Sequence, residues 1–360
     1  MTATPHKPRA RDLGIPFDGQ PGALNAITDV PGVAVGHQTL IEGAHIRTGV
    51  TAILPAGQEM PFSKLPAGFF SLNGNGEMTG MHWVEESGML EGPVMITNTH
   101  SVGVVRDAVI SWLTRKTDRS SEDYSFYLPV VAETFDGCLN DINGQHVTTQ
   151  DALAALNAAR SGPVAEGCVG GGTGMITHQF KAGIGTASRQ AIVNGNRYTV
   201  GALVQSNYGR REQLTIAGIP VGRELPDLMP DIRRFKDGSI IIVIATDAPL
   251  LPHQCKKLAR RAGLGLARMG SVAQNSSGDI FLAFSTHGPV QHGALARWDA
   301  IPHDDSMNPL FQATVEAVEE SIVNALIAAD TMHGIHGSVV HALPHAPLQA
   351  ILRRYGRLVE

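Results

Sequence analysis

The chain has 360 residues, of which 43% are hydrophobic and 17% charged, and its formal net charge is −5 at pH 7. This is the composition of an ordinary globular protein, and the length is sufficient to bury one large core. The acidic balance argues against nucleic acid or an anionic membrane surface as a partner.

The N-terminus contains no apolar stretch of the kind that a secretory signal requires. The longest strongly apolar run, from Ile240 to Ala245, is too short to span a bilayer. These features predict a cytoplasmic protein without a membrane segment. Cys138, Cys168 and Cys255 show neither CxxC spacing nor an even number, so we expect buried thiols rather than a zinc knuckle or disulfides.

Four stretches in the first half of the chain predict β-strands. Residues 33–40 and 48–55 are rich in apolar and β-branched side chains and are expected to pair as a hairpin. Residues 94–97 and 130–133 are also strand-like, and the second of these ends on a carboxylate, Glu133. Chemistry is commonly placed at such strand ends in layered folds.

Three helices are predicted in the same half. A turn-rich loop at residues 72–79 leads into a short helix at 81–87, in which Trp83 is expected to face the core. A second helix follows Ser101, because apolar side chains recur there at helical spacing. A third is expected to begin with Thr148 or Thr149 as its N-cap, because a threonine hydroxyl suits that position.

The second half predicts four further strands, at residues 181–189, 198–205, 239–245 and 280–284. Asp247 is expected to cap a helix that runs to about Met269, and Ser306 or Asn308 to cap a long apolar helix. Strands come in groups with helices between and after them, without strict β-α alternation. This order predicts an α+β fold of stacked, antiparallel-rich sheets covered by helices.

Two motifs suggest a cofactor or a metal ion, but neither has the spacing that such a site requires. The glycine-dense loop at residues 167–174 fits neither the G-x-G-x-x-G nor the Gly-Lys-Ser/Thr spacing of phosphate-binding loops, so close backbone packing near a site is the better interpretation. Four histidines, at positions 333, 336, 341 and 345, lack a carboxylate or cysteine at metal-site spacing. We therefore expect no metal and no cofactor.

A turn at residues 236–239 runs directly into the most β-branched apolar stretch of the chain, so that the first strand residue is Ser239. If Gly238 held the 238–239 peptide bond in a strained geometry, the Ser239 hydroxyl could attack its carbonyl. Cleavage would then give an N-terminal serine carrying its own basic amine. The alternative is an ordinary turn, since Asp-Gly commonly precedes a strand.

Several further stretches resemble the self-processing serine aminopeptidases that include the L-aminopeptidase/D-esterases and the β-peptidyl aminopeptidases. They are RDLGI at 11–15, RTGVT at 47–51, TNT at 97–99, ET and DG within 133–137, GGGTG at 170–174, DGS at 237–239 and DAP at 247–249. The resemblance implies one domain with a four-layer αββα sandwich like that of amine-terminal nucleophile hydrolases. It also implies cleavage into residues 1–238 and 239–360, and assembly as a homotetramer.

The same resemblance implies roles for individual residues. Ser239 is the nucleophile, Asn207 donates to the oxyanion, Glu133 receives the substrate's ammonium, and Ser277 with Asp279 holds the Ser239 amine and hydroxyl. Two positions depart from some relatives. Asp279 stands where they carry glutamate, and Phe135, next to the substrate, where they carry tyrosine; Tyr208 is a candidate to replace the missing hydroxyl.

Without the resemblance, structural interpretations compete. Asn207 begins a good turn sequence, and Glu133 suits a salt bridge at a strand end. A Ser-His-Asp triad on His178 or His287 also stays open. The expected activity is release of N-terminal residues from short peptides, amides or esters with a free amine. The alternatives are an acyltransferase resembling the ornithine acetyltransferases, and a non-cleaving binding protein of the same fold.

Overall fold

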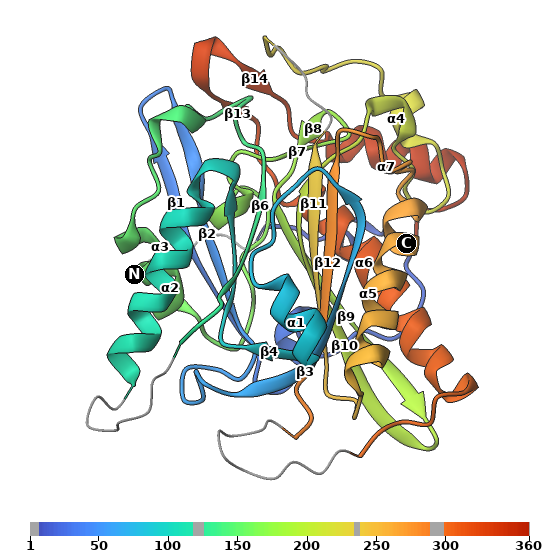
Figure 1. The fold of residues 1–360 in the computed structure, drawn as a ribbon. Coiled ribbons are helices and arrows are strands. Elements are labelled where there is room, and N and C mark those ends of the chain that lie inside the picture. The colour runs from blue at the N-terminus through green and yellow to red at the C-terminus, as the bar shows by residue number, and fades with distance from the viewer. Residues whose placement is uncertain (1–6, 118–125, 234–237, 289–298, 360) are drawn as a thin grey trace.

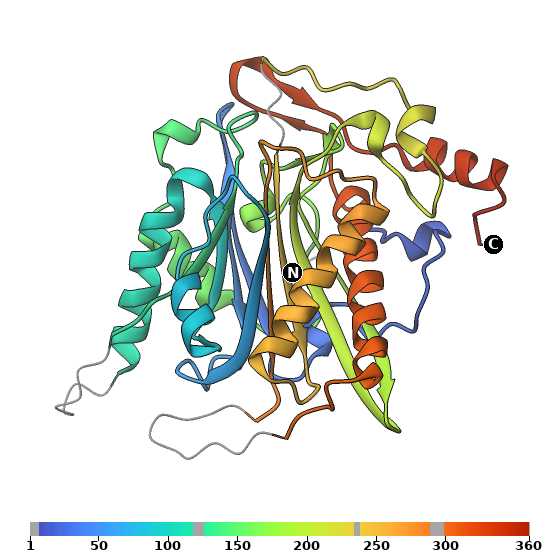
Figure 2. The same ribbon diagram turned by 45° about the vertical axis from the view of Figure 1, so that its right-hand side comes forward.

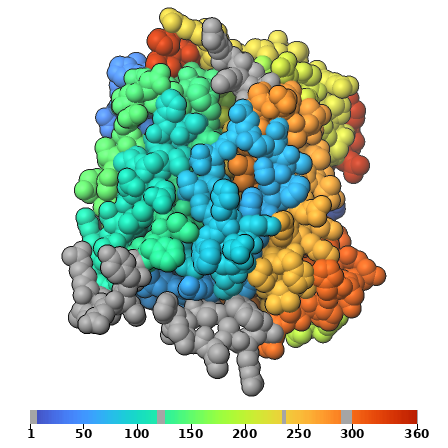
Figure 3. All heavy atoms as spheres, in the orientation of Figure 1, coloured from blue at the N-terminus to red at the C-terminus, as the bar shows by residue number. Residues whose placement is uncertain are grey.

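The computed structural model describes residues 7–117, 126–233, 238–288 and 299–359. Within these ranges, two β-sheets lie face to face and helices cover the outer side of each (Figures 1 and 2). Figure 3 shows the two halves at the surface, with teal and green segments over one sheet, orange helices over the other, and the blue segment around β3 between them. The expected α+β sandwich of four layers is confirmed.

The first sheet has the strand order β1-β2-β5-β6. Strands β1 (Ala34–Glu42) and β2 (Ile46–Leu54) form the predicted antiparallel hairpin, and β5 (Val94–Asn98) pairs parallel with β6 (Val130–Thr134). The parallel pair places Thr97 opposite Glu133. The carboxyl ends of both strands therefore meet at one edge of the sheet.

The second sheet has the order β4-β3-β12-β11-β10-β9. Its strands are β3 (Lys64–Gly74), β4 (Met89–Glu91), β9 (Ile184–Val193), β10 (Asn196–Asn207), β11 (Ser239–Thr246) and β12 (Gly278–Ser285). Strands β11 and β12 run parallel at the centre, whereas the other pairs are antiparallel. Two short hairpins, β7 (Ile176–Thr177) with β8 (Phe180–Lys181) and β13 (Met332–His333) with β14 (Val339–Val340), lie outside the sheets.

The core follows the layers. Helices α2 (Val102–Lys116) and α3 (Thr149–Ala158) pack on the first sheet, and α5 (Pro252–Arg268) and α6 (Asn308–Ile327) on the second. Alternate residues of β11 divide between two clusters, with Ile241 and Val243 between the sheets and Ile240 and Ile242 under the helices. Both faces of β11 are therefore buried, which explains its unbroken apolar run. The shorter helices are α1 (Met81–Ser87), α4 (Val221–Glu224) and α7 (His345–Arg354).

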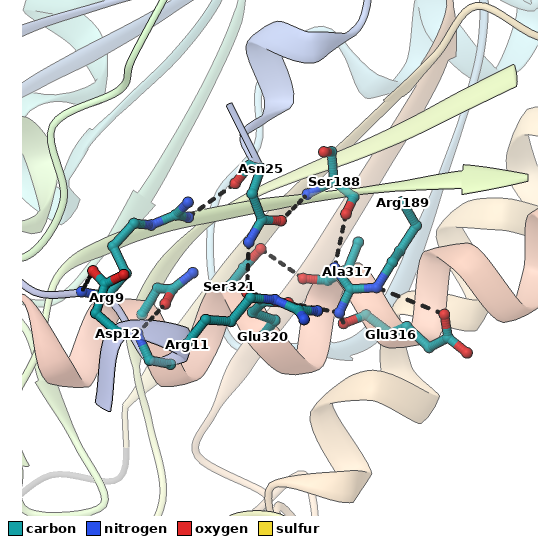
Figure 4. A network of polar contacts seen from close by, with 12 residues as sticks. Arg9, Arg11, Asp12, Asn25, Ser188, Arg189, Glu316, Ala317, Glu320 and Ser321 are labelled. Atoms are coloured by element: carbon teal, nitrogen blue, oxygen red, sulfur yellow. Dashed lines mark hydrogen bonds and ion pairs between the residues drawn. The ribbon is translucent and has the colours of Figure 1, made fainter. Parts of the chain in front are cut away.

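A buried ion-pair network ties the N-terminal segment to α6 (Figure 4). The carboxylate of Glu320 pairs with Arg189 at 2.6 Å and with Arg11 at 2.8 Å, and it accepts a hydrogen bond from Asn25. Burial opposes ionisation of Glu320, but the hydrogen bond from Arg11 and the charges of Arg189 and Arg11 hold the pKa of this carboxyl below its ordinary value. The network fixes residues distant in sequence on the side of the second sheet.

Most predicted elements are confirmed, but strand β3 was missed. Residues 64–74 contain Pro66 and Gly68, which usually interrupt strands. The structure explains Gly68, because a Cβ there would lie 2.5 Å from the backbone nitrogen of Lys256, where α5 packs on the strand. Close approach of the helix requires a glycine at this position.

Three local predictions were wrong. Trp83 is 37% exposed, and its indole nitrogen donates to Glu91 instead of packing in the core. Asp247 accepts a hydrogen bond from the Thr199 backbone at 2.7 Å, so it joins two strands and does not cap α5. The side chain of neither Ser306 nor Asn308 caps α6. No helix among the described residues is both long and apolar enough to cross a membrane.

Candidate active site

The first residue of β11 lies beside the last residue of β10. Ser239 and Asn207 are antiparallel partners, and both are buried. Gly238 approaches Asn207 so closely that a Cβ there would lie 1.6 Å from the Asn207 carbonyl oxygen. The expectation that Gly238 holds the 238–239 peptide bond in a strained geometry stays a prediction. A glycine is needed because no side chain fits.

The carboxamide of Asn207 is fixed at both ends. Its Oδ1 accepts a hydrogen bond from the Ile176 N–H at 2.8 Å, and its Nδ2 donates to the Phe135 carbonyl at 2.9 Å. Because a backbone N–H can only donate and a carbonyl can only accept, these partners define which end of the amide is which. The described residues offer no second acceptor to Nδ2. Gly209 follows with a φ of 84°, and the backbone from Tyr208 to Arg210 is irregular, without an assigned turn.

Ser277 and Asp279 lie at the start of β12, next to the start of β11. The Ser277 hydroxyl donates to Asp279 Oδ1 at 2.7 Å, and Asp279 faces Ile240 in the parallel register. Burial raises the pKa of Asp279 to about 6, against hydrogen bonds from Ser277 and the Ile240 backbone. Its Oδ2 is buried and has no hydrogen-bond partner within the described ranges. This carboxylate therefore has an unused acceptor beside the beginning of β11.

Glu133 is buried at the end of β6. Its Oε1 accepts from the Glu77 backbone at 3.0 Å, and the Thr99 hydroxyl donates to its Oε2. Burial raises the pKa of Glu133, although these two hydrogen bonds oppose the shift. In the part of the chain that the structure describes, no cationic side chain forms an ion pair with Glu133. The predicted structural salt bridge is therefore not formed there, and the site suits an external cation.

Tight glycine contacts join the carboxylate of Glu133 to the Ser277–Asp279 pair. A Cβ at Gly76 would lie 3.3 Å from both Glu133 Oε1 and the α-carbon of Gly278. Position 278 separates Ser277 from Asp279. On the other side, the hydrogen bond from Asn207 to the Phe135 carbonyl links β10 to the chain just after Glu133. Four distant parts of the sequence thus converge on one place.

Comparison with known proteins assigns the chain to a family. The model of Peptidase family S58 matches residues 25–340. The chain belongs to peptidase family S58. A β-peptidyl aminopeptidase BapA from Sphingosinicella microcystinivorans is 51% identical over an alignment covering 99% of this chain and 94% of that protein.

Solved structures agree with this assignment. The L-aminopeptidase D-Ala-esterase/amidase from Ochrobactrum anthropi, described as a prototype serine aminopeptidase and a variant of the Ntn hydrolase fold, superposes with a TM-score of 0.93. It is 49% identical, and the match covers 98% of this chain and 100% of that one. A β-aminopeptidase from Burkholderia sp., also 49% identical, has a TM-score of 0.90 over 97% and 99% of the two chains. The expected enzyme class, a serine aminopeptidase, is confirmed.

Two aromatic residues flank the site of this S58 peptidase. Phe135 is half-buried, and its ring lies over Gly137, where a Cβ would be 2.4 Å from Phe135 Cζ. Tyr208 is buried on the helix-covered side, and its hydroxyl has no hydrogen-bond partner in the described structure. Burial, and then the negative charge of Asp279, raises the pKa of Tyr208 well above its usual value. Substitution of Tyr208 for the missing tyrosine hydroxyl stays a prediction.

Among the described residues, no hydrogen bond joins Ser239 to either candidate histidine. His287 follows the far end of β12, and seven residues of a parallel strand separate that end from the level of Ser239, roughly 23 Å. His178 lies in the β7–β8 turn, where its Nδ1 donates to the Arg210 carbonyl and burial lowers its pKa to about 4. Among the described residues, no cluster of three or more His, Cys, Asp or Glu side chains could hold a metal ion.

Sequence reasoning did not assign several residues that build the site. Thr99, whose hydroxyl donates to Glu133, lies within the TNT stretch. The glycine loop leads to Ile176, whose backbone N–H donates to Asn207. The expectation for that loop is confirmed, since Cβ atoms at Gly171 and Gly172 would lie 2.2 Å from Gln205 Oε1 and 2.4 Å from the Ile184 nitrogen. Asp136, adjacent to Phe135, is also buried, and Asn98 and Asn140 donate to it. Its neighbours became apparent only in three dimensions.

Proposed function

We propose that this S58 peptidase cleaves its own chain between Gly238 and Ser239 and then acts as an aminopeptidase with Ser239 as nucleophile. The observation that carries the proposal is the contact of Gly238 with Asn207 at the buried start of β11, beside an Asp279 carboxylate with an unused oxygen. Processing would convert a single domain into two associated fragments, residues 1–238 and 239–360.

Self-cleavage proceeds in two steps. The Ser239 hydroxyl oxygen attacks the Gly238 carbonyl carbon, the hydroxyl proton passes to the Ser239 nitrogen as the C–N bond breaks, and the acyl group is transferred to oxygen as an ester. Water then hydrolyses the ester, leaving a carboxylate on Gly238 and a free amine on Ser239. An α-amine titrates near ~7.7–8, so it can accept the hydroxyl proton at neutral pH. As an ammonium it has a partner in Asp279, whose Oδ2 has no hydrogen-bond partner among the described residues.

Turnover repeats the same chemistry on a substrate. The amine of Ser239 accepts the proton of its own hydroxyl, and the oxygen attacks the substrate carbonyl. The second N–H of Asn207 Nδ2 donates to the oxyanion; loss of one such donor typically costs about 10²–10³ in rate. The proton passes to the leaving group, and water hydrolyses the acyl-enzyme. Ser277 orients Asp279 through its hydrogen bond.

The buried Glu133 selects substrates with a free amine. Its carboxylate is held by neutral donors and is available to bind an ammonium group. Because it binds the free N-terminal ammonium of the substrate, the enzyme is an exopeptidase. Substrates are short peptides, amides or esters, with Phe135 beside the acyl group. Since a 51% identical relative is a β-peptidyl aminopeptidase, the substrates include peptides with N-terminal β-amino acids. We further propose that the enzyme is cytoplasmic and, by family resemblance, a homotetramer.

Intact mass spectrometry of freshly purified protein tests this proposal. Wild-type protein should give two masses matching residues 1–238 and 239–360, whereas Ser239→Ala should give one intact, inactive chain. Amino-acid p-nitroanilides should be hydrolysed and their N-acetylated forms should not. An intact wild-type chain that hydrolyses peptides would refute the mechanism, and transfer of acetyl groups without p-nitroaniline release would favour the acyltransferase alternative.

A further inference from the structure

Lys181 is a fully buried lysine without a carboxylate partner of its own in the described structure. It ends β8, and its Nζ donates to the carbonyls of Met175 at 2.9 Å and Ala182 at 2.7 Å. Asp330, the acid that acts on it at longer range, is paired with Lys7. A buried lysine is expensive to maintain, so its contacts indicate a use beyond packing.

The lysine lies two hydrogen bonds from the Asn207 side chain. The Met175 carbonyl, which accepts from Lys181, and the Ile176 N–H, which donates to Asn207 Oδ1 at 2.8 Å, are the two ends of one peptide group. The β7–β8 hairpin pairs Ile176 with Lys181, and β7 contacts β10, the strand that ends on Asn207. The chain of contacts therefore runs from the ammonium, through one peptide, to the carboxamide.

Such a chain has a defined electronic effect. A cation at a carbonyl draws electron density from the peptide and makes its N–H a stronger donor. That N–H in turn polarises the Asn207 carboxamide, so its Nδ2 hydrogens become stronger donors; each bond in such a chain is strengthened by perhaps 10–30%. Because the lysine acts through fixed groups, it also holds the amide in one orientation before substrate arrives.

We propose that Lys181 is a positioning residue that orients and polarises the Asn207 amide for the oxyanion. The inference rests on the proposed role of Asn207. Burial lowers the pKa of Lys181, while the nearby Cys168 thiol opposes that shift and so favours the charged form. The sulfur shares the Ala182 carbonyl with Lys181, at 4.0 Å.

The test compares Lys181→Met with Lys181→Gln and with a matched control. Lys181→Met removes every donor, whereas Lys181→Gln keeps a neutral donor that can hold the hairpin. Thr177→Val is the control. Thr177 lies in the same hairpin as Lys181, and the substitution removes its buried hydrogen bond to Ser206 of β10 without changing the 175–176 peptide. For each variant, kcat, KM, Tm and the fraction processed are measured on an amino-acid p-nitroanilide, using fully processed protein for the kinetics.

Both lysine variants should lower kcat, Lys181→Met by about 10-fold, a fraction of the about 10²–10³ expected for complete loss of an oxyanion donor. KM should stay close to wild type, since substrate binding uses Glu133. Thr177→Val should lower Tm without this change in kcat. If Lys181→Met does not fold, Lys181→Gln decides the question.

The inference is overturned if Lys181→Gln retains wild-type kcat, or if the lysine variants and Thr177→Val lose kcat in proportion to Tm. An Asn207→Ala chain distinguishes failure of the proposed function. If it is processed and turns over like wild type, Asn207 is not the oxyanion donor. If it is unprocessed or slow while the lysine variants are unaffected, the role of Asn207 stands and only that of Lys181 fails.

Discussion

Gly238 and Asn207 are in such close contact that a Cβ at position 238 would lie 1.6 Å from the Asn207 carbonyl oxygen and 3.0 Å from its Nδ2. The proposed scissile bond is therefore held against the residue proposed to stabilise its oxyanion. Strand pairing sets this relationship, because Ser239 and Asn207 are opposite each other in the sheet. The consequences of the arrangement can be measured one residue at a time.

Gly238→Ala should prevent or greatly slow self-cleavage. The added methyl must displace the Asn207 backbone or the start of β11, and either movement misaligns the attacking hydroxyl; a misplacement of about 1 Å can cost about 10²-fold. Intact mass and a denaturing gel report the fraction cleaved. The matched control is Gly103→Ala in α2, where a Cβ would meet nothing within 4 Å, and which should be processed normally. Full processing of Gly238→Ala would contradict the close contact.

Glu133→Gln should weaken capture of substrate more than self-processing. The maturing peptide bond has no free ammonium, whereas a substrate loses a charge-assisted hydrogen bond of about 1.5–3 kcal/mol, or about 10–100-fold in kcat/KM. Steady-state kinetics and intact mass separate the two effects. Glutamine keeps one oxygen that can accept from the Glu77 backbone, and its amide nitrogen can donate to the Thr99 hydroxyl, so the fold should persist. Equal loss of processing and turnover would make Glu133 a structural residue.

Asp279→Asn should move the pH profile of the processed enzyme. If the Ser239 amine is the base, kcat/KM rises with pH as the amine loses its proton, and a neighbouring carboxylate raises the pKa of that amine. Removing the charge should shift the rising limb to lower pH. Substrates with different amine pKa values serve as the control, since the enzyme's ionisation must not follow theirs. A limb unmoved by the substitution would contradict the assignment.

The same substitution should stabilise the uncleaved Ser239→Ala chain at neutral pH. Burial raises the pKa of Asp279 from 3.8 to about 6, so the unfolded chain ionises this group first. Between these values the folded state holds a proton that the unfolded state has released. Stability is therefore lost as pH rises through that window, by on the order of 2–3 kcal/mol.

The measurement is thermal unfolding of Ser239→Ala with and without Asp279→Asn at pH 4 and pH 8. Asparagine does not ionise, so the double variant should gain stability relative to Ser239→Ala at pH 8 and not at pH 4. Other groups titrate equally in both chains and cancel in the comparison. A difference between the two chains that is the same at both pH values would show that Asp279 is not perturbed by burial.

The sequence by itself determined the layers and the candidate residues of this peptidase. Apolar periodicity located both strands of the β1–β2 hairpin, the buried strand after Gly238 and the helix that buries Val105 and Trp112, because local patterning reflects which face is buried. The resemblance named Ser239, Asn207 and Glu133. These residues lie more than 100 positions apart at the extremes, and no local pattern states that they meet.

Tertiary structure decided why particular residues are required. It gave a steric reason for a glycine at position 238, since the constraint comes from Asn207 on another strand. It also removed His287 from the site, because the parallel register of β11 and β12 puts that residue at the far end of the sheet. The sequence predicted Lys181 only as the first residue of a strand. Its burial and its contact with the Met175 carbonyl, which connect it to Asn207, are visible only in the structure. Steric and electrostatic constraints of this kind arise between segments distant in sequence, so periodicity and motif spacing do not contain them.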